Sequence, residues 1–425
     1  MKYYLVGIKG SGMAAIACLL SDLGHQVEGC DVSRYIFTEK ELKKRNISID
    51  SFDNFTIKPY DYAIIGNSFE NYRHYFDSNK VLTYQEVISY LSNKHFSVAV
   101  CGTHGKTTTS HMVYQTLKET NKCSTIIGDG YGKATKDCNT FVFEACEYKD
   151  NFLNYTPNII LVTNIDYDHV DYFKTNQQYV DSFINFINNA KNFALINNDD
   201  VNSNKIKDQI KIKYYTYGID NKSDVQASNI LYLENGISFD IKYGNITYKN
   251  LFVPLFGKHI FYDALSCIAL SLILQKSIHS TIKNLSLFKH PSRRFNVIEC
   301  HYNNIIVDDY GHHPLEIQNT INAIKQKYNY EKLIIIFHPD RASRIDYFFK
   351  QYIEVFSQAN KTFVIPFLNV ENDKQEQDII KRFSFVENIE VFDDNFFNNS
   401  YKNTIFLFTG SKDMSQYIRQ LLNIL

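Results

Sequence analysis

The sequence predicts an α/β fold built from three successive units, each with a largely parallel sheet. Three observations lead to this prediction. Apolar segments of strand length alternate with helical segments along the chain. Two of these apolar segments run directly into glycine-rich turns that open a helix. The length of 425 residues suits two to four domains with buried cores.

The first unit is predicted to cover residues 1–94. An apolar strand over residues 2–8 ends in a turn that contains Gly7, Gly10 and Gly12, and the following helix stops at Gly24. The next strand ends at Asp31. Such a turn, with an acid about twenty residues further on, is typical of domains that bind a nucleotide through its pyrophosphate. The elements expected here are strands over 2–8, 26–30 and 62–66, helices over 13–23 and 84–91, and a polar linker over 92–95.

The second unit, residues 95–290, opens with the most informative stretch of the chain. An apolar strand runs into Gly102-Thr-His-Gly-Lys-Thr-Thr108, and a helix follows. Tight glycine turns aim backbone N–H groups at one point, and the helix N-terminus adds partial positive charge there. Lys106 adds a full charge, and Thr107 offers a hydroxyl suited to Mg²⁺. The stretch predicts a phosphate loop for ATP or GTP, although two residues separate its glycines where the general pattern has four.

The remaining elements continue the alternation of strands and helices. In the second unit we expect strands over 140–143, 158–162 and 193–196, a hairpin of 237–243 with 246–256, and an apolar helix over 264–274. The third unit is predicted to cover residues 291–425. It should contain a hairpin over 296–307, strands over 333–337, 362–365 and 404–408, and a C-terminal helix.

Acidic and histidine side chains follow several of these strands. Glu144 and Glu147 come directly after the strand over 140–143, where a carboxylate can hold Mg²⁺. The segment 163–171 follows the next strand and contains Asp168, His169 and Asp171. Because ligand sites of α/β proteins form at the carboxyl ends of strands, this cluster indicates a metal or substrate site.

The third unit carries two further polar clusters. One combines the pair Arg293 and Arg294 with the segment Asp308-Asp-Tyr-Gly-His-His-Pro314. In the other, Arg341 and Arg344 lie three residues apart after a predicted strand end. Guanidinium groups suit carboxylates and phosphates, so the two side chains can reach the same anion.

Composition and charge limit the partners, metals and cellular locations that can be expected for the protein. The formal net charge of −1 gives no global electrostatic case for nucleic acid or a membrane surface as partner. The eight cysteines form no Cys-x-x-Cys pair, which argues against zinc and favours free thiols in a reducing cytosol. The N-terminus does not have the pattern of a signal peptide, and no apolar run has membrane-spanning length. We therefore expect a cytoplasmic protein.

Taken in order, these motifs resemble those of the Mur ligases of peptidoglycan synthesis. The most specific are Gly-Thr-His-Gly-Lys-Thr at residues 102–107 and Asp-Asp-Tyr-Gly-His-His-Pro at residues 308–314. The resemblance covers all three units. It implies a UDP-binding Rossmann-like first domain, a central ATPase domain and a Rossmann-like C-terminal domain. It further implies ATP-dependent ligation of L-alanine to UDP-N-acetylmuramate, with ATP and Mg²⁺ required.

The resemblance also assigns residues. Lys106, Glu144, His169, Arg341 and Arg344 would be catalytic, with Thr107, Glu144 and His169 on metal ions and the two arginines near the substrate carboxylate. The ATP contacts would come from Gly102, Thr103, His104, Gly105, Lys106, Thr107, Thr108, Asp263, Arg294, Asp309 and His312. The UDP-sugar contacts would come from Gly10, Ser11, Gly12, Met13, Asp31 and Ser68.

The chain departs from the family pattern at three places. Ile260 and Asp263 replace two asparagines that help to hold adenine, and Asp340 and residues 410–413 differ where the amino acid should bind. Three alternatives therefore stay open: a related ligase for another amino acid or a peptide, a nicotinamide-dependent oxidoreductase built on residues 1–90, and a non-catalytic nucleotide-binding regulator. The sequence leaves open whether the chain is a monomer or a homodimer.

Overall fold

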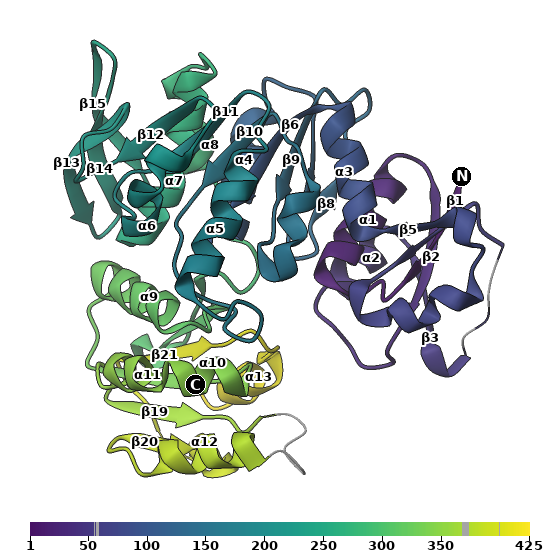
Figure 1. The fold of residues 1–425 in the computed structure, drawn as a ribbon. Coiled ribbons are helices and arrows are strands. Elements are labelled where there is room, and N and C mark those ends of the chain that lie inside the picture. Colours follow the sequence, from purple (N-terminus) through teal and green to yellow (C-terminus); the bar gives the residue numbers. More distant parts are fainter. Residues whose placement is uncertain (55, 57–58, 368–373, 399) are drawn as a thin grey trace.

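The computed structural model describes residues 1–425 except 55, 57–58, 368–373 and 399. Its strands form three sheets, which lie in three lobes that follow the chain from the N-terminus to the C-terminus (Figure 1). The N-terminal lobe packs against one side of the central lobe, and the C-terminal lobe lies below the central one in this view. The predicted α/β fold with three domains is confirmed.

The N-terminal lobe has a five-stranded parallel sheet in the order β3-β2-β1-β4-β5. Its strands are β1 (Lys2–Val6), β2 (Gln26–Asp31), β3 (Ser48–Ser51), β4 (Tyr62–Ile65) and β5 (Val81–Thr83), and its helices are α1 (Ser11–Asp22), α2 (Glu39–Lys44) and α3 (Tyr84–Lys94). The predicted linker over residues 92–95 is wrong for most of its length, because α3 continues to Lys94. Its polar Ser92 is buried and donates a hydrogen bond to Ser97 at 3.1 Å.

The central lobe has a ten-stranded sheet in the order β15-β14-β13-β12-β11-β10-β6-β9-β7-β8. The strands from β13 through β7 run parallel, and the antiparallel pairs lie toward the two edges, so the mostly parallel sheet is confirmed. The strands are β6 (Phe96–Cys101), β7 (Cys123–Ile126), β8 (Gly132–Lys133), β9 (Thr140–Glu144), β10 (Ile159–Val162), β11 (Phe193–Asn197), β12 (Tyr214–Gly218), β13 (Val225–Leu233), β14 (Gly236–Tyr243) and β15 (Ile246–Val253). The helices are α4 (Lys106–Leu117), α5 (Asn176–Ile187), α6 (Val201–Lys205), α7 (Lys258–Ile273) and α8 (Ile278–Ser286).

The C-terminal lobe has a six-stranded sheet in the order β16-β17-β21-β18-β19-β20. The first pair is the predicted antiparallel hairpin, and the other pairs are parallel. The strands are β16 (Asn296–Glu299), β17 (Ile305–Asp309), β18 (Lys332–Phe337), β19 (Lys361–Val364), β20 (Ile389–Val391) and β21 (Thr404–Thr409). The helices are α9 (Pro314–Lys327), α10 (Ala342–Tyr347), α11 (Phe349–Phe356), α12 (Lys374–Ser384) and α13 (Ser415–Leu422).

The N-terminal and central lobes meet in a tight joint. Gly132 on β8 lies so close to α1 that a Cβ atom built on it would stand 1.8 Å from the carbonyl oxygen of Ala15. Arg45, just after α2, donates a hydrogen bond to the carbonyl of Gly132 at 3.1 Å and pairs with Asp22 at the end of α1. The hydrophobic core of the N-terminal lobe continues through this joint into the central lobe, where it includes Phe141.

Strand order also places the predicted site residues. In the central sheet β6 lies between β10 and β9, so the phosphate loop, Glu144 and the segment after β10 share one edge of the sheet. In the C-terminal sheet β17 and β18 flank β21, which brings residues 309–314 near residues 338–344. In the described part of the chain, none of the helices is long and apolar enough to cross a membrane.

Candidate active site

The stretch over residues 102–107 folds as a compact turn between β6 and α4. Gly102 has a φ of +140° and Gly105 a φ of +79°, conformations that favour glycine. A Cβ atom on Gly102 would come within 2.0 Å of the Thr163 hydroxyl. Helix α4 begins at Lys106, and no side chain caps its N-terminus. The backbone N–H groups of that first turn therefore remain suited to an anionic ligand.

Lys106 lies in this turn and pairs with a buried carboxylate. Its ammonium stands 2.9 Å from an oxygen of Glu147, which is 1% exposed, and also donates to the carbonyl of Thr103. Burial disfavours the charge on Lys106, but the carboxylate of Glu147 outweighs that effect and raises the pKa of the ammonium. Lys106 is therefore a fixed positive charge at the phosphate loop.

Oxygen and nitrogen ligands suited to a divalent cation gather beside Lys106. Thr107 donates its hydroxyl hydrogen to Glu144 at 3.0 Å, so the two predicted Mg²⁺ ligands are neighbours. His169 places Nε2 3.3 Å from Glu147, and its buried Nδ1 has no hydrogen-bond partner in the described part of the chain. Hydroxyl and carboxylate oxygens fit Mg²⁺, and a histidine nitrogen can join a second ion.

The two predicted anion-binding arginines reach this place from the C-terminal lobe. Arg344 forms two hydrogen bonds with Asp168, at 3.0 and 3.1 Å, and both side chains are buried. Arg341 pairs with Asp171 at 2.9 Å. Burial of Asp168 works against its charge, but the Arg344 guanidinium holds the pKa of that carboxyl well below its usual range. Both arginines therefore tie the C-terminal lobe to the central lobe.

A cavity of about 240 Å³ joins these groups. Its lining includes Lys106, Thr107, Glu144, His169, Arg294, His312, Arg341 and Arg344. The structure thus brings all five predicted catalytic residues to one space. Four arginines and one lysine line this cavity together with the acids at the predicted metal-ligand positions. Such an arrangement allows a phosphate and a carboxylate to approach each other.

Residues of the C-terminal lobe also touch the phosphate loop. Arg294 donates to the hydroxyl of Thr107 at 3.4 Å and stacks on the ring of Tyr310. Asp309 accepts hydrogen bonds from the backbone N–H groups of Phe295 and Gly311, both at 2.8 Å. Burial raises the pKa of Asp309 although Arg294 opposes that shift. Asp309 thus holds the turn that presents Arg294 to the loop.

Glu316 is a site residue that the sequence analysis missed. It is the third residue of α9 and forms a capping box with His313 at the helix start. The Pro-x-Glu spacing at residues 314–316 is the signal that could have pointed to it. Its Oε1 lies 3.1 Å from Nδ1 of His104, and its Oε2 accepts from the backbone N–H of His312 at 3.0 Å.

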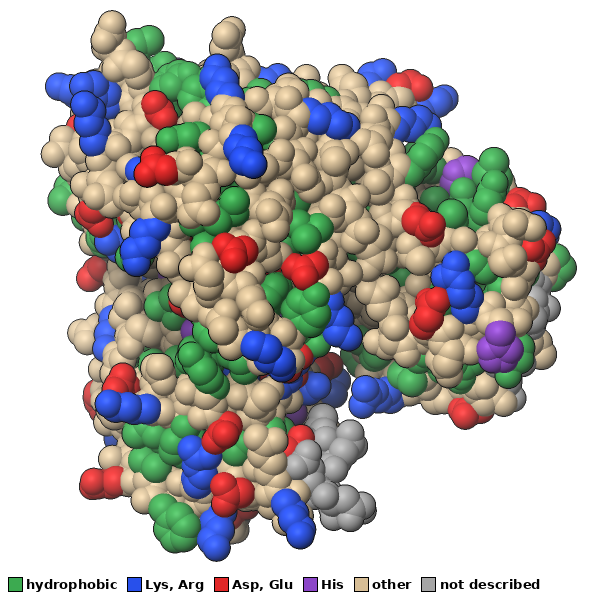
Figure 2. All heavy atoms as spheres, in the orientation of Figure 1, with side chains coloured by type: hydrophobic (Ala, Val, Ile, Leu, Met, Phe, Trp, Pro, Cys, Tyr) green, Lys and Arg blue, Asp and Glu red, His purple; other side chains and the backbone are tan. Residues whose placement is uncertain are grey.

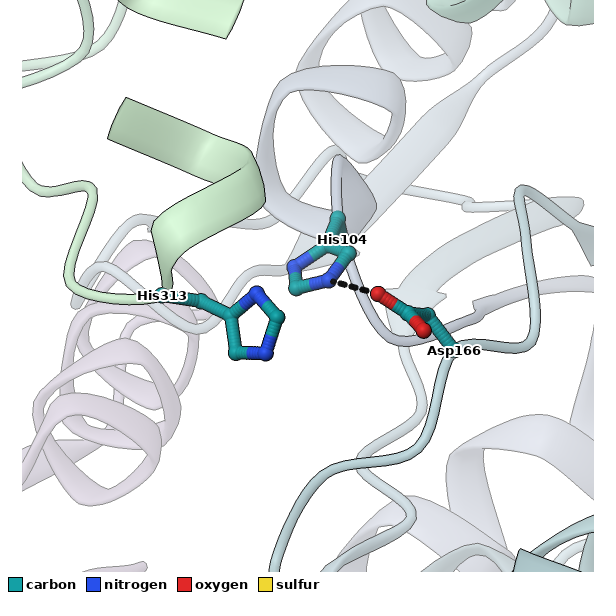
Figure 3. Close-up of side chains that lie close together, drawn as sticks. All are labelled: His104, Asp166 and His313. Carbon is teal, nitrogen blue, oxygen red and sulfur yellow. Dashed lines mark hydrogen bonds and ion pairs between the residues drawn. The ribbon is translucent and has the colours of Figure 1, made fainter. Parts of the chain in front are cut away.

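Besides Glu316 of the C-terminal lobe, His104 contacts a second carboxylate, that of Asp166 in its own lobe. Its Nε2 lies 3.2 Å from Asp166, and the ring of His313 approaches it with a centroid distance of 4.8 Å (Figure 3). Burial disfavours the charged ring, but hydrogen bonds to Asp166 and Glu316 prevail and raise the pKa of His104 to about 9. At neutral pH His104 is therefore an imidazolium that bridges two acids.

A second cavity, of about 400 Å³, lies between α7 and α9 and adjoins the first. The two cavities share Gly105, Arg294 and Glu316 in their linings. Of the predicted ATP contacts, this cavity is lined by His104, Gly105, Thr108, Asp263, Arg294 and Asp309. It opens directly beside the predicted phosphate loop and has the size for a nucleoside.

A third cavity, of about 320 Å³, lies at the glycine-rich turn of the N-terminal lobe. It shares Ser11, Gly128 and Glu144 with the cavity that contains Lys106. The predicted substrate contacts that line it are Gly10, Ser11, Gly12, Met13 and Ser68. Asp31 is not in its lining: the Asp31 carboxylate is buried and accepts from the backbone N–H of Lys9 at 2.6 Å. On the face drawn in Figure 2, a hollow separates the N-terminal lobe from the C-terminal lobe, and Lys and Arg side chains lie at its edge.

Comparison with known proteins gives consistent similarities over all three lobes. Residues 2–92 match the model described as "Mur ligase family, catalytic domain", residues 100–271 match "Mur ligase middle domain", and residues 293–398 match "Mur ligase, glutamate ligase domain". The chain is 36% identical to UDP-N-acetylmuramate–L-alanine ligase from Lacticaseibacillus paracasei over 100% of this chain and 98% of that protein. The same identity holds for the protein of that name from Lacticaseibacillus casei, over 98% and 96%.

Among solved structures, the fold is similar to that of UDP-N-acetylmuramate–alanine ligase from Thermotoga maritima. The TM-score is 0.79 at 22% identity, and the alignment covers 100% of this chain and 98% of that one. At this level of identity the likeness bears on the fold, which agrees in all three lobes.

Proposed function

The chain belongs to the Mur ligase family, and on that premise we propose that it joins L-alanine to the carboxylate of UDP-N-acetylmuramate in an ATP-dependent reaction. The two relatives that are 36% identical to the chain are named for this activity. The observation that carries the proposal is the shared cavity in which the phosphate-loop Lys106 faces Arg341 and Arg344. This cavity adjoins the glycine-rich turn on one side and the nucleoside-sized cavity on the other.

The chemistry follows from the charges in that cavity. A carboxylate resists attack because its own negative charge repels a nucleophile. Transfer of the γ-phosphoryl group of ATP to a carboxylate oxygen gives an acyl phosphate and ADP. The amine of alanine then attacks the acyl carbon and forms the C–N bond, while inorganic phosphate leaves with the electrons of the C–O bond. Loss of one proton from the nitrogen gives the amide.

Charge placement is the main barrier in such a phosphoryl transfer. Lys106 would hold the phosphates of ATP at the start of α4, where backbone N–H groups add to its charge. Arg341 and Arg344 would orient the substrate carboxylate in line with the γ-phosphate, which is a positioning effect. In the structure Arg341 pairs with Asp171 and Arg344 pairs with Asp168. A bound substrate carboxylate would therefore share the positive charge of the two guanidinium groups with these aspartates.

The residues present fit a requirement for Mg²⁺. The adjacent Thr107 and Glu144 would hold one ion, and His169, with its unpartnered Nδ1, would contribute to a second. A bound Mg²⁺ would offset the charge that builds up on the phosphate oxygens during transfer. The catalytic groups named here come from the central and C-terminal lobes, so these two lobes would close around the ligands before the reaction starts.

The test is ADP formation with UDP-N-acetylmuramate and a panel of amino acids, glycine, L-serine and D-alanine among them. We expect turnover to require both the UDP-sugar and an amino acid, with L-alanine preferred. Preference for a different amino acid would identify a related ligase, in keeping with the changes at Asp340 and residues 410–413. ATP hydrolysis that ignores both substrates would contradict the proposal.

A further inference from the structure

Three metal-ligating side chains from distant parts of the chain meet at one point between the central and C-terminal lobes. They are His104 of the phosphate loop, Asp166 of the segment after β10, and His313 directly before α9. One ligand atom from each lies within 4.8 Å of the other two. Figure 3 shows the His313 ring with its nitrogen-bearing edge toward the other two side chains. This cluster shares no residue with the predicted Mg²⁺ ligands.

The first two side chains already stand at the spacing of metal ligands. Nε2 of His104 lies 3.2 Å from a carboxylate oxygen of Asp166. Two ligand atoms bound to one tetrahedral Zn²⁺ at about 2.0–2.1 Å are separated by about 3.4 Å. The backbone of Asp166 is fixed, because its N–H and its carbonyl both bond to the hydroxyl of Thr103. A metal ion would take the place of the proton between the ring and the carboxylate.

The other ring nitrogen of His104 has the partner that a metal-bound histidine usually has. Nδ1 lies 3.1 Å from Oε1 of Glu316. Glu316 is itself held in place, because its Oε2 accepts from the backbone N–H groups of His312 and His313. A carboxylate that accepts the proton of one ring nitrogen fixes the tautomer in which the other nitrogen can bind a metal. Nε2, directed at Asp166, is therefore the ligand atom of His104.

His313 supplies a buried group that lacks a partner. The residue is 5% exposed, and its Nε2 has no hydrogen-bond partner in the described part of the chain. Burial lowers the pKa of the imidazole to about 4, so the ring is neutral at pH 7 and can offer a lone pair. Its Nδ1 accepts from the N–H of Leu315 over a long 3.3 Å. Metal binding through Nε2 would move the ring proton to Nδ1 and would cost only that weak bond.

The donor set decides which ion fits. Imidazole nitrogens suit Zn²⁺, whereas Mg²⁺ takes oxygen ligands and keeps several of its waters. Three protein ligands leave the fourth tetrahedral position for water. The side chain of Asp166 is 42% exposed, so an ion can reach the cluster from solvent. Once bound, the ion would fix the start of α9 in the C-terminal lobe to the phosphate loop of the central lobe.

We propose that His104, Asp166 and His313 form an inhibitory Zn²⁺ site that holds the central and C-terminal lobes together and slows turnover. Lobes that close around substrates have to separate again to release products, so an ion that joins them opposes this step. Binding of the metal does not depend on the proposed function. Only the inhibition rests on it.

The first experiment titrates Co²⁺, a spectroscopic stand-in for Zn²⁺, into the full chain at pH 8 without Mg²⁺ or nucleotide. We expect the intense visible absorption of four-coordinate Co²⁺, displaced by Zn²⁺. His313→Asn is the matched variant, because asparagine is a good helix cap and removes the metal ligand. It should lose the absorption. His169→Gln alters a predicted Mg²⁺ ligand instead and should keep it.

Three spectral outcomes would overturn the site. They are absorption that persists in the His313 variant, absorption that is lost in the His169 variant, and a near-ultraviolet sulfur-to-cobalt band. The last would place the ion on a thiol such as the exposed Cys146. Absence of four-coordinate absorption from the unaltered protein would overturn it as well.

The second experiment measures ADP formation at saturating Mg²⁺ and substrates while Zn²⁺ is added. The Zn²⁺ concentration for half inhibition should be at least tenfold higher for His313→Asn than for the unaltered protein, and a zinc-selective chelator should restore turnover. Zn²⁺ that binds without slowing turnover, or that inhibits both proteins equally, would overturn the inhibitory role. If no ADP forms even without Zn²⁺, the proposed function fails, and the Co²⁺ spectra still decide whether the site exists.

Discussion

Arg344 and Asp168 form a buried, two-point ion pair between the C-terminal and central lobes, with hydrogen bonds of 3.0 and 3.1 Å. Asp340 adds a third contact to the same guanidinium at 3.3 Å. This pair lies in the wall of the cavity that contains Lys106, so the guanidinium that joins the two lobes is also the one proposed to orient the substrate carboxylate.

Replacing Arg344 with alanine should therefore weaken the fold as well as the reaction. The variant leaves the Asp168 carboxylate buried without its partner, and a loss of about 3–5 kcal/mol in the free energy of unfolding is expected. The matched control is Arg341→Ala, because the Arg341–Asp171 pair is one-third exposed and should contribute less than about 1 kcal/mol. Urea unfolding measures both, and equal losses would contradict the distinction between the two pairs.

Replacing Lys106 with alanine should abolish phosphate release while the chain stays folded. The loss of a preorganised charge at the transferring phosphate is expected to lower kcat/KM by about 10²-fold or more. Lys118→Ala is the control, since Lys118 is exposed at the end of the same helix and stacks on Tyr114. Steady-state ADP formation with all three substrates compares the two variants; near-normal turnover of the Lys106 variant would refute the phosphate-loop assignment.

Replacing Glu144 with glutamine should raise the concentration of Mg²⁺ needed for half-maximal activity. Glu144 contacts Thr107, and a neutral amide binds a divalent cation far less tightly than a carboxylate. A shift of about tenfold or more is expected, with activity partly restored at high Mg²⁺. Glu119→Gln, an exposed position beyond α4, is the control and should show no shift. An unchanged Mg²⁺ dependence in the Glu144 variant would place the ion elsewhere.

Stability should fall as the pH rises past neutrality because of His104. The pKa of His104 is raised to about 9 in the folded chain and is about 6.5 when unfolded, so the folded state binds the extra proton more tightly. The resulting stabilisation is complete below about pH 6.5 and is lost as the pH rises through about 9, with a size on the order of 3 kcal/mol. His104→Gln removes the titrating group.

Unfolding by urea at pH 6, 7.5 and 9 checks the prediction for His104. The unaltered protein should lose stability between pH 7.5 and pH 9, and the Gln variant should lose less over the same interval. His301→Gln is a control, because His301 lies in an exposed turn of the C-terminal lobe and should leave the pH dependence unchanged. If the free energy of unfolding changes equally with pH in the unaltered protein and in the His104 variant, Asp166 and Glu316 do not hold a charged ring.

The sequence was sufficient for the order of units and for most buried parallel strands, because such strands are continuous apolar runs. It did not predict β13, whose apolar residues 230–233 are mostly exposed and follow the polar Ser228 and Asn229, so that no strand pattern runs through the whole element. The linker expected over residues 92–95 was wrong because the burial of Ser92 depends on Ser97, which no local pattern reveals.

The sequence predicted only those parts of the site whose residues lie close together along the chain. The phosphate loop and the strand-end acids were found because their residue types and spacing carry the chemistry. The pairing of Glu147 with Lys106 and of Glu316 with His104 depends on side chains that meet across 41 and 212 positions of the chain, and spacing gives no sign of it. The domain boundaries and the roles of the individual site residues stay predictions.

The contact between Gly132 and Ala15 has a mechanical consequence. No side chain larger than hydrogen fits at residue 132, and Arg45 clamps the same place from the neighbouring helix, so the first two lobes behave as one rigid platform. Closure around the ligands would then fall to the third lobe, which follows the segment between α8 and β16. An inhibitor that holds this lobe away from the platform would stop the catalytic cycle without competing for any of the three substrates.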